Sequence, residues 1–186
     1  MKRLIAASKK LAFEEYDKYK IPIEKHIVLS RDKGVELAKK LNANEDVVEV
    51  GTYLMDCLLG KAIKDGKQKE HVSISLDKAN EILKPYNIEE SVKENIRHCI
   101  SEHHGVNKFH SLESEICCNA DCYRFLSVKG FTYTIRYIRE MPFKDLVKLL
   151  DYKVAEKWNA LTLDICKKEL EPQYKTIQKF LKSLKS

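Results

Sequence analysis

Glycine and proline are scarce in this sequence. Six glycines and four prolines occur among 186 residues, and so few helix breakers favour long helices over a many-turned β-protein. Internal repeats and low-complexity stretches are also lacking, so we expect one ordered domain. A chain of this length can bury a sizeable core. These absences predict an all-α fold, an orthogonal bundle of helices.

Long apolar runs are lacking too. No stretch approaches the roughly 18 residues that a membrane-spanning helix needs. The apolar stretch near the N-terminus is too short for a secretory signal, because charge returns at Lys9 and Lys10. We therefore expect a cytoplasmic protein with reduced thiols and no membrane partner. The six cysteines show no Cys-x-x-Cys spacing, so structural zinc and a disulfide framework have little support.

Positive charge is not concentrated in any one block. The net charge of +6 is spread along the chain, and no basic segment is interleaved with aromatic residues as a single-strand binder requires. Nucleic acid is therefore a disfavoured partner. A small phosphorylated compound fits the charge at least as well.

Apolar residues recur at helical spacing along most of the sequence. We expect Asn44 and Ser111 to be helix N-caps, Gly60 to end the third helix before a lysine-rich loop, and Pro142 and Pro172 to break the C-terminal helices. The pattern predicts helices over residues 1–20, 26–41, 47–59, 71–83, 92–103 and 112–121, then two or three more after residue 130.

Two carboxylates lie in apolar stretches of these predicted helices. Asp56 lies in Tyr-Leu-Met-Asp-Cys-Leu-Leu, and Asp121 lies in Ile-Cys-Cys-Asn-Ala-Asp-Cys-Tyr. A buried carboxylate is costly unless a cation compensates it. One shared divalent metal would satisfy both acids. Alternatively, each acid meets a helix N-terminus or a basic side chain such as Arg124 or Arg97, and the residues alone leave these alternatives open.

The order of the polar residues resembles the HD phosphohydrolase family, over about residues 20–128. The family pattern is a lone His, a His-Asp pair, further histidines and a late Asp. Flanking segments also resemble it: VELAKKLNANEDVVEVGTYLMD, EHVSIS, IRHCISEHH and LESEICCNAD. In this sequence the pattern falls on His26, Met55-Asp56, His71, His103-His104 and Asp121.

The resemblance implies an HD-type bundle with a core at about residues 20–128 and extra C-terminal helices at about 129–186. It implies metal ligands at His26, Asp56 and Asp121. It further implies that His71, His103 and His104 bind a second metal or the substrate phosphate, so that these three and Asp56 are the catalytic candidates. Carboxylates and imidazoles suit Mn, Mg, Fe, Ni or Zn, and such an ion activates water and neutralises phosphoryl charge.

Position 55 departs from the pattern, because methionine stands where the family has histidine. A thioether is a poor ligand for Mg, Mn or Fe(II). The metal is then bound weakly, retained with the help of a middle histidine, or absent. Methionine on a buried helix also commonly serves only to fill space.

The leading interpretation is a metal-dependent phosphohydrolase, acting on a nucleotide or other small phosphorylated compound through a depleted metal site. The alternative is a degenerate, non-catalytic HD-fold protein that binds a nucleotide or a protein partner. Substrate, metal and oligomeric state stay open. The C-terminal helices could pack on the bundle or on a second subunit in a homodimer.

Overall fold

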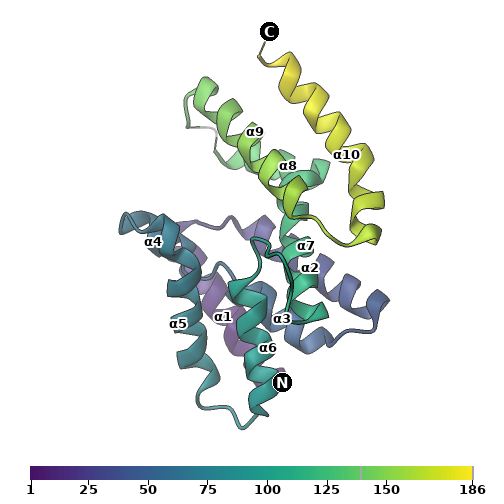
Figure 1. Cartoon of the computed structure of the whole chain (residues 1–186). Helices are drawn as coiled ribbons and strands as arrows, with labels where there is room; N and C mark the ends of the chain where they lie inside the picture. Colours follow the sequence, from purple (N-terminus) through teal and green to yellow (C-terminus); the bar gives the residue numbers. More distant parts are fainter. Residues whose placement is uncertain (139, 186) are drawn as a thin grey trace.

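The structure, a computed structural model, describes residues 1–138 and 140–185, and all regular secondary structure in that part of the chain is helical (Figure 1). The prediction of an all-α fold is confirmed. None of the described helices is long and apolar enough to cross a membrane. The helices are α1 (Lys2–Tyr19), α2 (Glu24–Leu41), α3 (Glu45–Leu54), α4 (Leu59–Lys64), the 3₁₀ turn η1 (Gln68–Glu70), α5 (His71–Leu83), α6 (Glu90–Ser101), α7 (Leu112–Leu126), α8 (Val128–Tyr137), α9 (Phe143–Ala160) and α10 (Asp164–Ser183).

Helix α7 is the centre of the molecule. It packs against α2, α3, α6, α8, α9 and α10. Of its fifteen residues, eleven are buried, which a helix requires when it is covered on nearly all sides. Figure 1 shows α8, α9 and α10 together at one end of the body that α1 to α7 form. Helices of the α1–α7 body and the C-terminal helices therefore both pack around the functional side chains on α7.

Two predicted helix caps are confirmed. The Asn44 side chain accepts a hydrogen bond from the Val47 amide at 3.2 Å, at the start of α3. Ser111 accepts from the Ser114 amide at 3.0 Å, and the Ser114 hydroxyl accepts from the Ser111 amide, which completes a capping box at the start of α7.

The prediction that Gly60 ends the third helix is wrong. Helix α3 ends at Leu54, and Gly60 lies inside α4. A Cβ atom at position 60 would lie 2.5 Å from the Ile21 carbonyl oxygen and from Tyr19 Cβ. Glycine is needed here for close packing against the end of α1, so it did not signal a helix terminus. Much of the predicted lysine-rich loop is likewise helical, in α4 and η1.

Pro172 does not break a helix either, because it lies inside α10. The helix continues through it since the buried residues Leu170, Ile177 and Leu181 anchor α10 on both sides of the proline. Tertiary packing therefore offsets the missing amide donor. Pro142, in contrast, directly precedes α9, so this predicted break is confirmed.

Candidate active site

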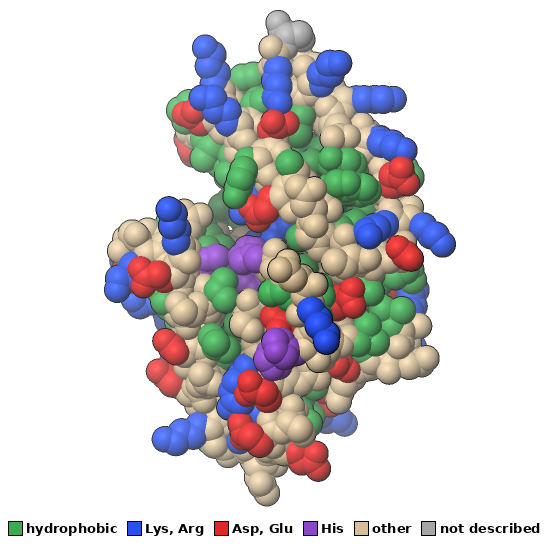
Figure 2. Space-filling model, in the orientation of Figure 1, with side chains coloured by type: hydrophobic (Ala, Val, Ile, Leu, Met, Phe, Trp, Pro, Cys, Tyr) green, Lys and Arg blue, Asp and Glu red, His purple; other side chains and the backbone are tan. Residues whose placement is uncertain are grey.

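Four of the predicted site residues lie together. Each of Asp56, His71, His103 and His104 offers one ligand atom, and these atoms all lie within 4.8 Å of one another. Asp56 comes from the turn after α3, His71 from the first residue of α5, and the adjacent histidines from the turn after α6. Figure 2 shows histidine side chains at a hollow between the body of the molecule and its C-terminal helices.

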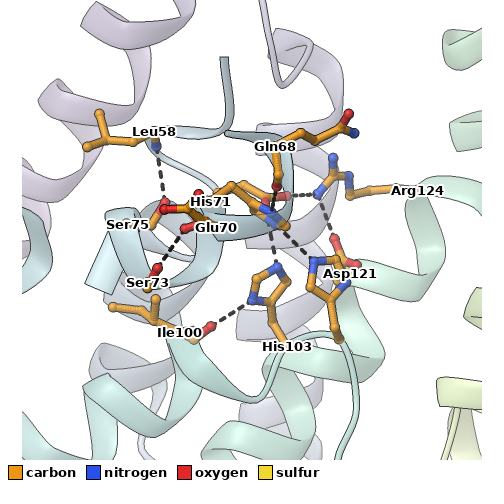
Figure 3. Close-up of polar contacts among 12 residues, drawn as sticks. Leu58, Gln68, Glu70, His71, Ser73, Ser75, Ile100, His103, Asp121 and Arg124 are labelled. Atoms are coloured by element: carbon orange, nitrogen blue, oxygen red, sulfur yellow. Dashed lines mark hydrogen bonds and ion pairs between the residues drawn. The ribbon is translucent and has the colours of Figure 1, made fainter. Parts of the chain in front are cut away.

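Backbone carbonyls orient two of the rings (Figure 3). Nδ1 of His71 donates to the Gln68 carbonyl oxygen, and Nδ1 of His103 donates to that of Ile100, both at 2.7 Å. In the neutral rings this leaves a lone pair on each Nε2. These Nε2 atoms lie 3.3 Å and 3.4 Å from Asp56 Oδ1. Two lone pairs thus face one carboxylate oxygen.

Two buried polar atoms at this point have no hydrogen-bond partner among the described residues. They are Asp56 Oδ1 and His103 Nε2, although buried polar atoms are nearly always satisfied. Burial opposes protonation of His71, but the nearby Asp56 carboxylate outweighs it and raises the pKa of His71. A proton on His71 or a cation between the three groups would remove the conflict.

His104 has the opposite tautomer. Lys157 Nζ lies 3.0 Å from His104 Nδ1 and can only donate to it. The neutral ring therefore carries its hydrogen on Nε2, which lies 2.9 Å from Nε2 of His71. Burial, together with the nearby Lys157 charge, lowers the pKa of His104 to about 3. His104 is thus a neutral hydrogen-bond donor at physiological pH.

Protein cations compensate both buried acids. Nη1 of Arg124 contacts Asp56 Oδ2 and lies 2.6 Å from Asp121 Oδ1, as Figure 3 shows for Asp121. Lys157 Nζ lies 2.6 Å from the other oxygen of Asp121. Burial opposes ionisation of both acids. The Arg124 charge at Asp56, and the Lys157 and Arg124 charges at Asp121, hold both pKa values well below the usual range. Of the alternatives left open by the sequence, pairing with a basic side chain is the one observed, through Arg124; Arg97 instead pairs with surface acids.

Lys157 was not among the residues predicted from the sequence. Only 1% of this residue is exposed, and it lies on α9 at helical spacing from the buried Val154 and Leu161. A charged residue in register with a buried apolar face was the available signal, because such a position demands an acidic partner.

His26, the first predicted metal ligand, is directed elsewhere. Its Nε2 donates to the Gly130 carbonyl oxygen at 3.1 Å and lies 3.2 Å from the Thr134 hydroxyl. Burial, followed by the Arg124 charge, lowers its pKa to about 3. Among the described residues, neither His26 nor Asp121 belongs to a group of converging ligand atoms. The three predicted ligands therefore do not surround one common point.

A divalent metal fits one part of this site and not the other. Around Asp56 Oδ1, two imidazole lone pairs and a carboxylate oxygen are donors that transition metals prefer. The carbonyl bonds to Nδ1 are typical of metal-ligating histidines. Between Asp56 and Asp121, a guanidinium already occupies the space, so the residues there do not fit an ion.

An adjoining cavity of about 410 Å³ could receive a substrate. Arg124, Lys153 and Gln68 contribute polar groups to its wall, and most of the remaining lining is apolar, including Ile21 and Phe125. Met55 does not line this cavity. It is 2% exposed and packs in the core, next to a void of about 10 Å³ shared with His26 and Arg124.

A second cluster of ligand-type residues lies nearer the surface, where His98, Glu102 and His110 converge. The two imidazoles stack with ring centroids 3.9 Å apart and planes 8° apart. Parallel stacked rings cannot both direct in-plane lone pairs at one ion. Glu102 also accepts from the His110 amide at 3.2 Å, so the cluster serves to fix the loop after α6.

No protein-family model and no curated protein matches this sequence. Two solved structures are similar. One is a protein from an uncultured Thermotogales bacterium, described as a predicted HD superfamily hydrolase, with a TM-score of 0.68 and 14% identity over 98% of this chain and 90% of that one. The other is Bacillus subtilis YpgQ, with a TM-score of 0.62 and 16% identity over 95% of each chain. At these identities the similarity shows the fold, and this chain therefore has an HD-type fold.

Proposed function

We propose that the protein is a metal-dependent phosphohydrolase of the HD superfamily that acts on a small phosphorylated compound, with nucleotides as the first class to test. One observation carries the proposal. The Nε2 atoms of half-buried His71 and buried His103 face one oxygen of Asp56, and among the described residues His103 Nε2 and Asp56 Oδ1 have no hydrogen-bond partner. A divalent cation would satisfy both of these atoms and would have His71 Nε2 within reach as a third ligand.

We assign Asp56, His71 and His103 as the residues that hold this ion. Three protein ligands would leave coordination positions for water and substrate, as catalytic sites require. The bound ion supplies a water of lowered pKa and positive charge for the phosphoryl group. Asp56 is assigned as a ligand and not as a base, because its depressed pKa makes it a weak proton acceptor.

His104 is assigned to the substrate phosphate. Lys157 keeps the hydrogen of this ring on Nε2, so the ring can donate to a phosphate oxygen without carrying charge itself. Lys153, whose charge acts on His71, adds positive charge from the cavity wall. We expect anionic substrates to bind with the phosphate at this end and the organic group against the apolar wall.

We further propose that the metal set is smaller than that of the HD pattern. Met55 offers only a buried thioether where the pattern has histidine, and His26 is hydrogen-bonded to the backbone of α8. His26 and Asp121, implied as ligands by the resemblance, are therefore assigned no direct contact with the ion. The cavity limits only the size of the organic part of the substrate.

The test is phosphate release from a panel of nucleotides and sugar phosphates, with Mn, Mg, Fe, Co, Ni or Zn added, alongside elemental analysis. We expect turnover with at least one metal. The substitution His103→Ala should lower it by more than about 100-fold, since a lost ligand costs more than a lost supporting contact. His98→Ala, on α6 before that turn and outside the site, should retain activity. Absence of both bound metal and turnover would refute the proposal.

A non-catalytic role in binding a nucleotide or a protein partner is the second candidate. The observation that favours it is the neutralisation of both buried acids by Arg124 and Lys157, which needs no metal. This role predicts that a nucleotide or a protein partner binds as tightly in EDTA as with metal. It also predicts that no turnover is seen. Calorimetric titration of nucleotides with and without EDTA separates the two candidates.

A further inference from the structure

Arg124 lies at the point where two buried carboxylates meet. Its Nη1 contacts Asp56 and lies 2.6 Å from Asp121, and Lys157 lies 2.6 Å from the remaining oxygen of Asp121. At most 7% of any of these four residues is exposed. The arrangement is thus a buried ion-pair network, with Arg124 at its edge on the cavity wall.

The charges of this network already balance. Two carboxylates are matched by one guanidinium and one ammonium, each in direct contact with an acid. A divalent ion between Asp56 and Asp121 would have to share that point with the guanidinium, whose Nη1 contacts both carboxylates. Burying two cations side by side is unfavourable, so the guanidinium excludes an ion from this position.

The nearby residues do not favour binding of an ion either. Nε2 of His26 is held by the Gly130 carbonyl oxygen and the Thr134 hydroxyl. Met55 contributes no charge. The guanidinium is also supplied by the same helix as one of its acids, three residues after Asp121, where helical geometry places side chains together.

We infer that Arg124 stands in place of a metal ion between Asp56 and Asp121, so that the chain binds at most one divalent ion, at Asp56, His71 and His103. The position of that one ion rests on the proposed function. The exclusion of an ion by Arg124 does not. It follows that Arg124, and not Met55, prevents an ion from binding between Asp56 and Asp121.

Metal stoichiometry of single and double variants tests this directly. Mn²⁺ binding to the full chain would be measured by calorimetry and by elemental analysis after desalting. We expect wild type to bind one ion. Met55→His restores the ligand of the HD pattern but leaves the guanidinium in place, so it should still bind one. Met55→His with Arg124→Met should bind two, one more than Met55→His alone.

Two results would overturn the inference: a second ion bound by wild type or by Met55→His alone, or no added ion in a folded double variant. Arg124→Lys in the Met55→His background keeps the cation and should bind no second ion. If wild type binds no ion, the proposed function fails, yet the double variant should still gain one.

The double variant lacks the buried guanidinium, so its folding is measured by circular dichroism with and without Mn²⁺. If it is unfolded in EDTA, an ion taking the place of the guanidinium should restore the helical signal. A separate measurement leaves Arg124 unchanged. The double variant His71→Ala with His103→Ala should bind no Mn²⁺. If it does bind an ion, and adding Asp121→Asn removes that ion, the inference is contradicted.

Discussion

Histidines at this site differ in which ring nitrogen carries the hydrogen, and neighbouring atoms decide it. Main-chain carbonyls take the Nδ1 hydrogen of His71 and His103, whereas Lys157 donates to Nδ1 of His104. The first two rings can be metal ligands through Nε2, and the third is a donor. The sequence predicted all three positions, but their tautomers depend on contacts with the residues before α5, at the end of α6 and on α9.

His26 should make stability depend on pH. Its pKa is lowered from 6.5 to about 3, chiefly by burial. The unfolded chain therefore takes up a proton below pH 6.5 and the folded chain does not. The resulting stabilisation is fully present above pH 6.5 and is lost as the pH falls toward 3. By linkage, one such group costs about 2 kcal/mol of stability on going from pH 7.5 to pH 5.

The measurement is urea unfolding at both pH values, in EDTA. His26→Gln retains a donor for the Gly130 carbonyl but has no titrating group, so wild type should lose about 2 kcal/mol more than the variant over this interval. Comparing each protein with itself at pH 7.5 removes any fixed cost of the substitution. Equal losses in the two proteins would show that His26 is not buried in its neutral form.

Helix boundaries at the site follow from packing more than from local signals. Helix α3 stops at Leu54, and a turn with the Cys57 amide bonded to the Leu54 carbonyl at 3.2 Å carries Asp56 toward α5 and α6. The continuous apolar pattern predicted one longer helix, because hydrophobic periodicity does not reveal such a turn. The capped starts of α3 and α7 were predictable, since a cap is a local side-chain bond.

Gly60→Ala should destabilise the contact between α4 and the end of α1. The added Cβ would come within 2.5 Å of a backbone oxygen, which cannot move without shifting the chain before α2. We expect a loss of about 1–3 kcal/mol, the usual cost of overpacking. Gly66→Asn is the matched control, because nothing lies within 4 Å of a Cβ there and asparagine tolerates its positive φ.

Urea unfolding of both glycine variants gives the comparison. Gly66→Asn should stay within about 1 kcal/mol of wild type. If Gly60→Ala unfolds at the same urea concentration as Gly66→Asn, the close approach of α4 to α1 is absent in solution.

At the scale of the whole molecule, Lys157 joins the C-terminal helices to the site. It extends from α9 to Asp121 on α7 and to His104 after α6. Lys157→Met should destabilise the protein by about 3–5 kcal/mol, because it leaves a buried carboxylate short of one partner. Lys185→Met removes a half-exposed ion pair with Asp151 and should cost no more than about 1 kcal/mol.

Free energies of unfolding in urea are again the measurement. Adding Asp121→Asn to Lys157→Met should recover part of the loss, since the unpaired charge is then gone. If Lys157→Met costs no more than Lys185→Met, the buried pair does not attach α9 to the core.

Three expectations from the sequence stay predictions. They are the division into a core at about 20–128 and an extension at about 129–186, the cytoplasmic location and the homodimer.

The helical class, two helix caps and two buried acids that need compensation could be predicted from the sequence alone. These features follow from residue types and local spacing, which act over one or two helical turns. What compensates the acids depends on the folded chain. Arg124 is near Asp121 in sequence, but Asp56 and Lys157 reach the same point from the turn after α3 and from α9. Charge balance at a buried point depends on which helices meet there, and periodicity along one helix carries no information about that.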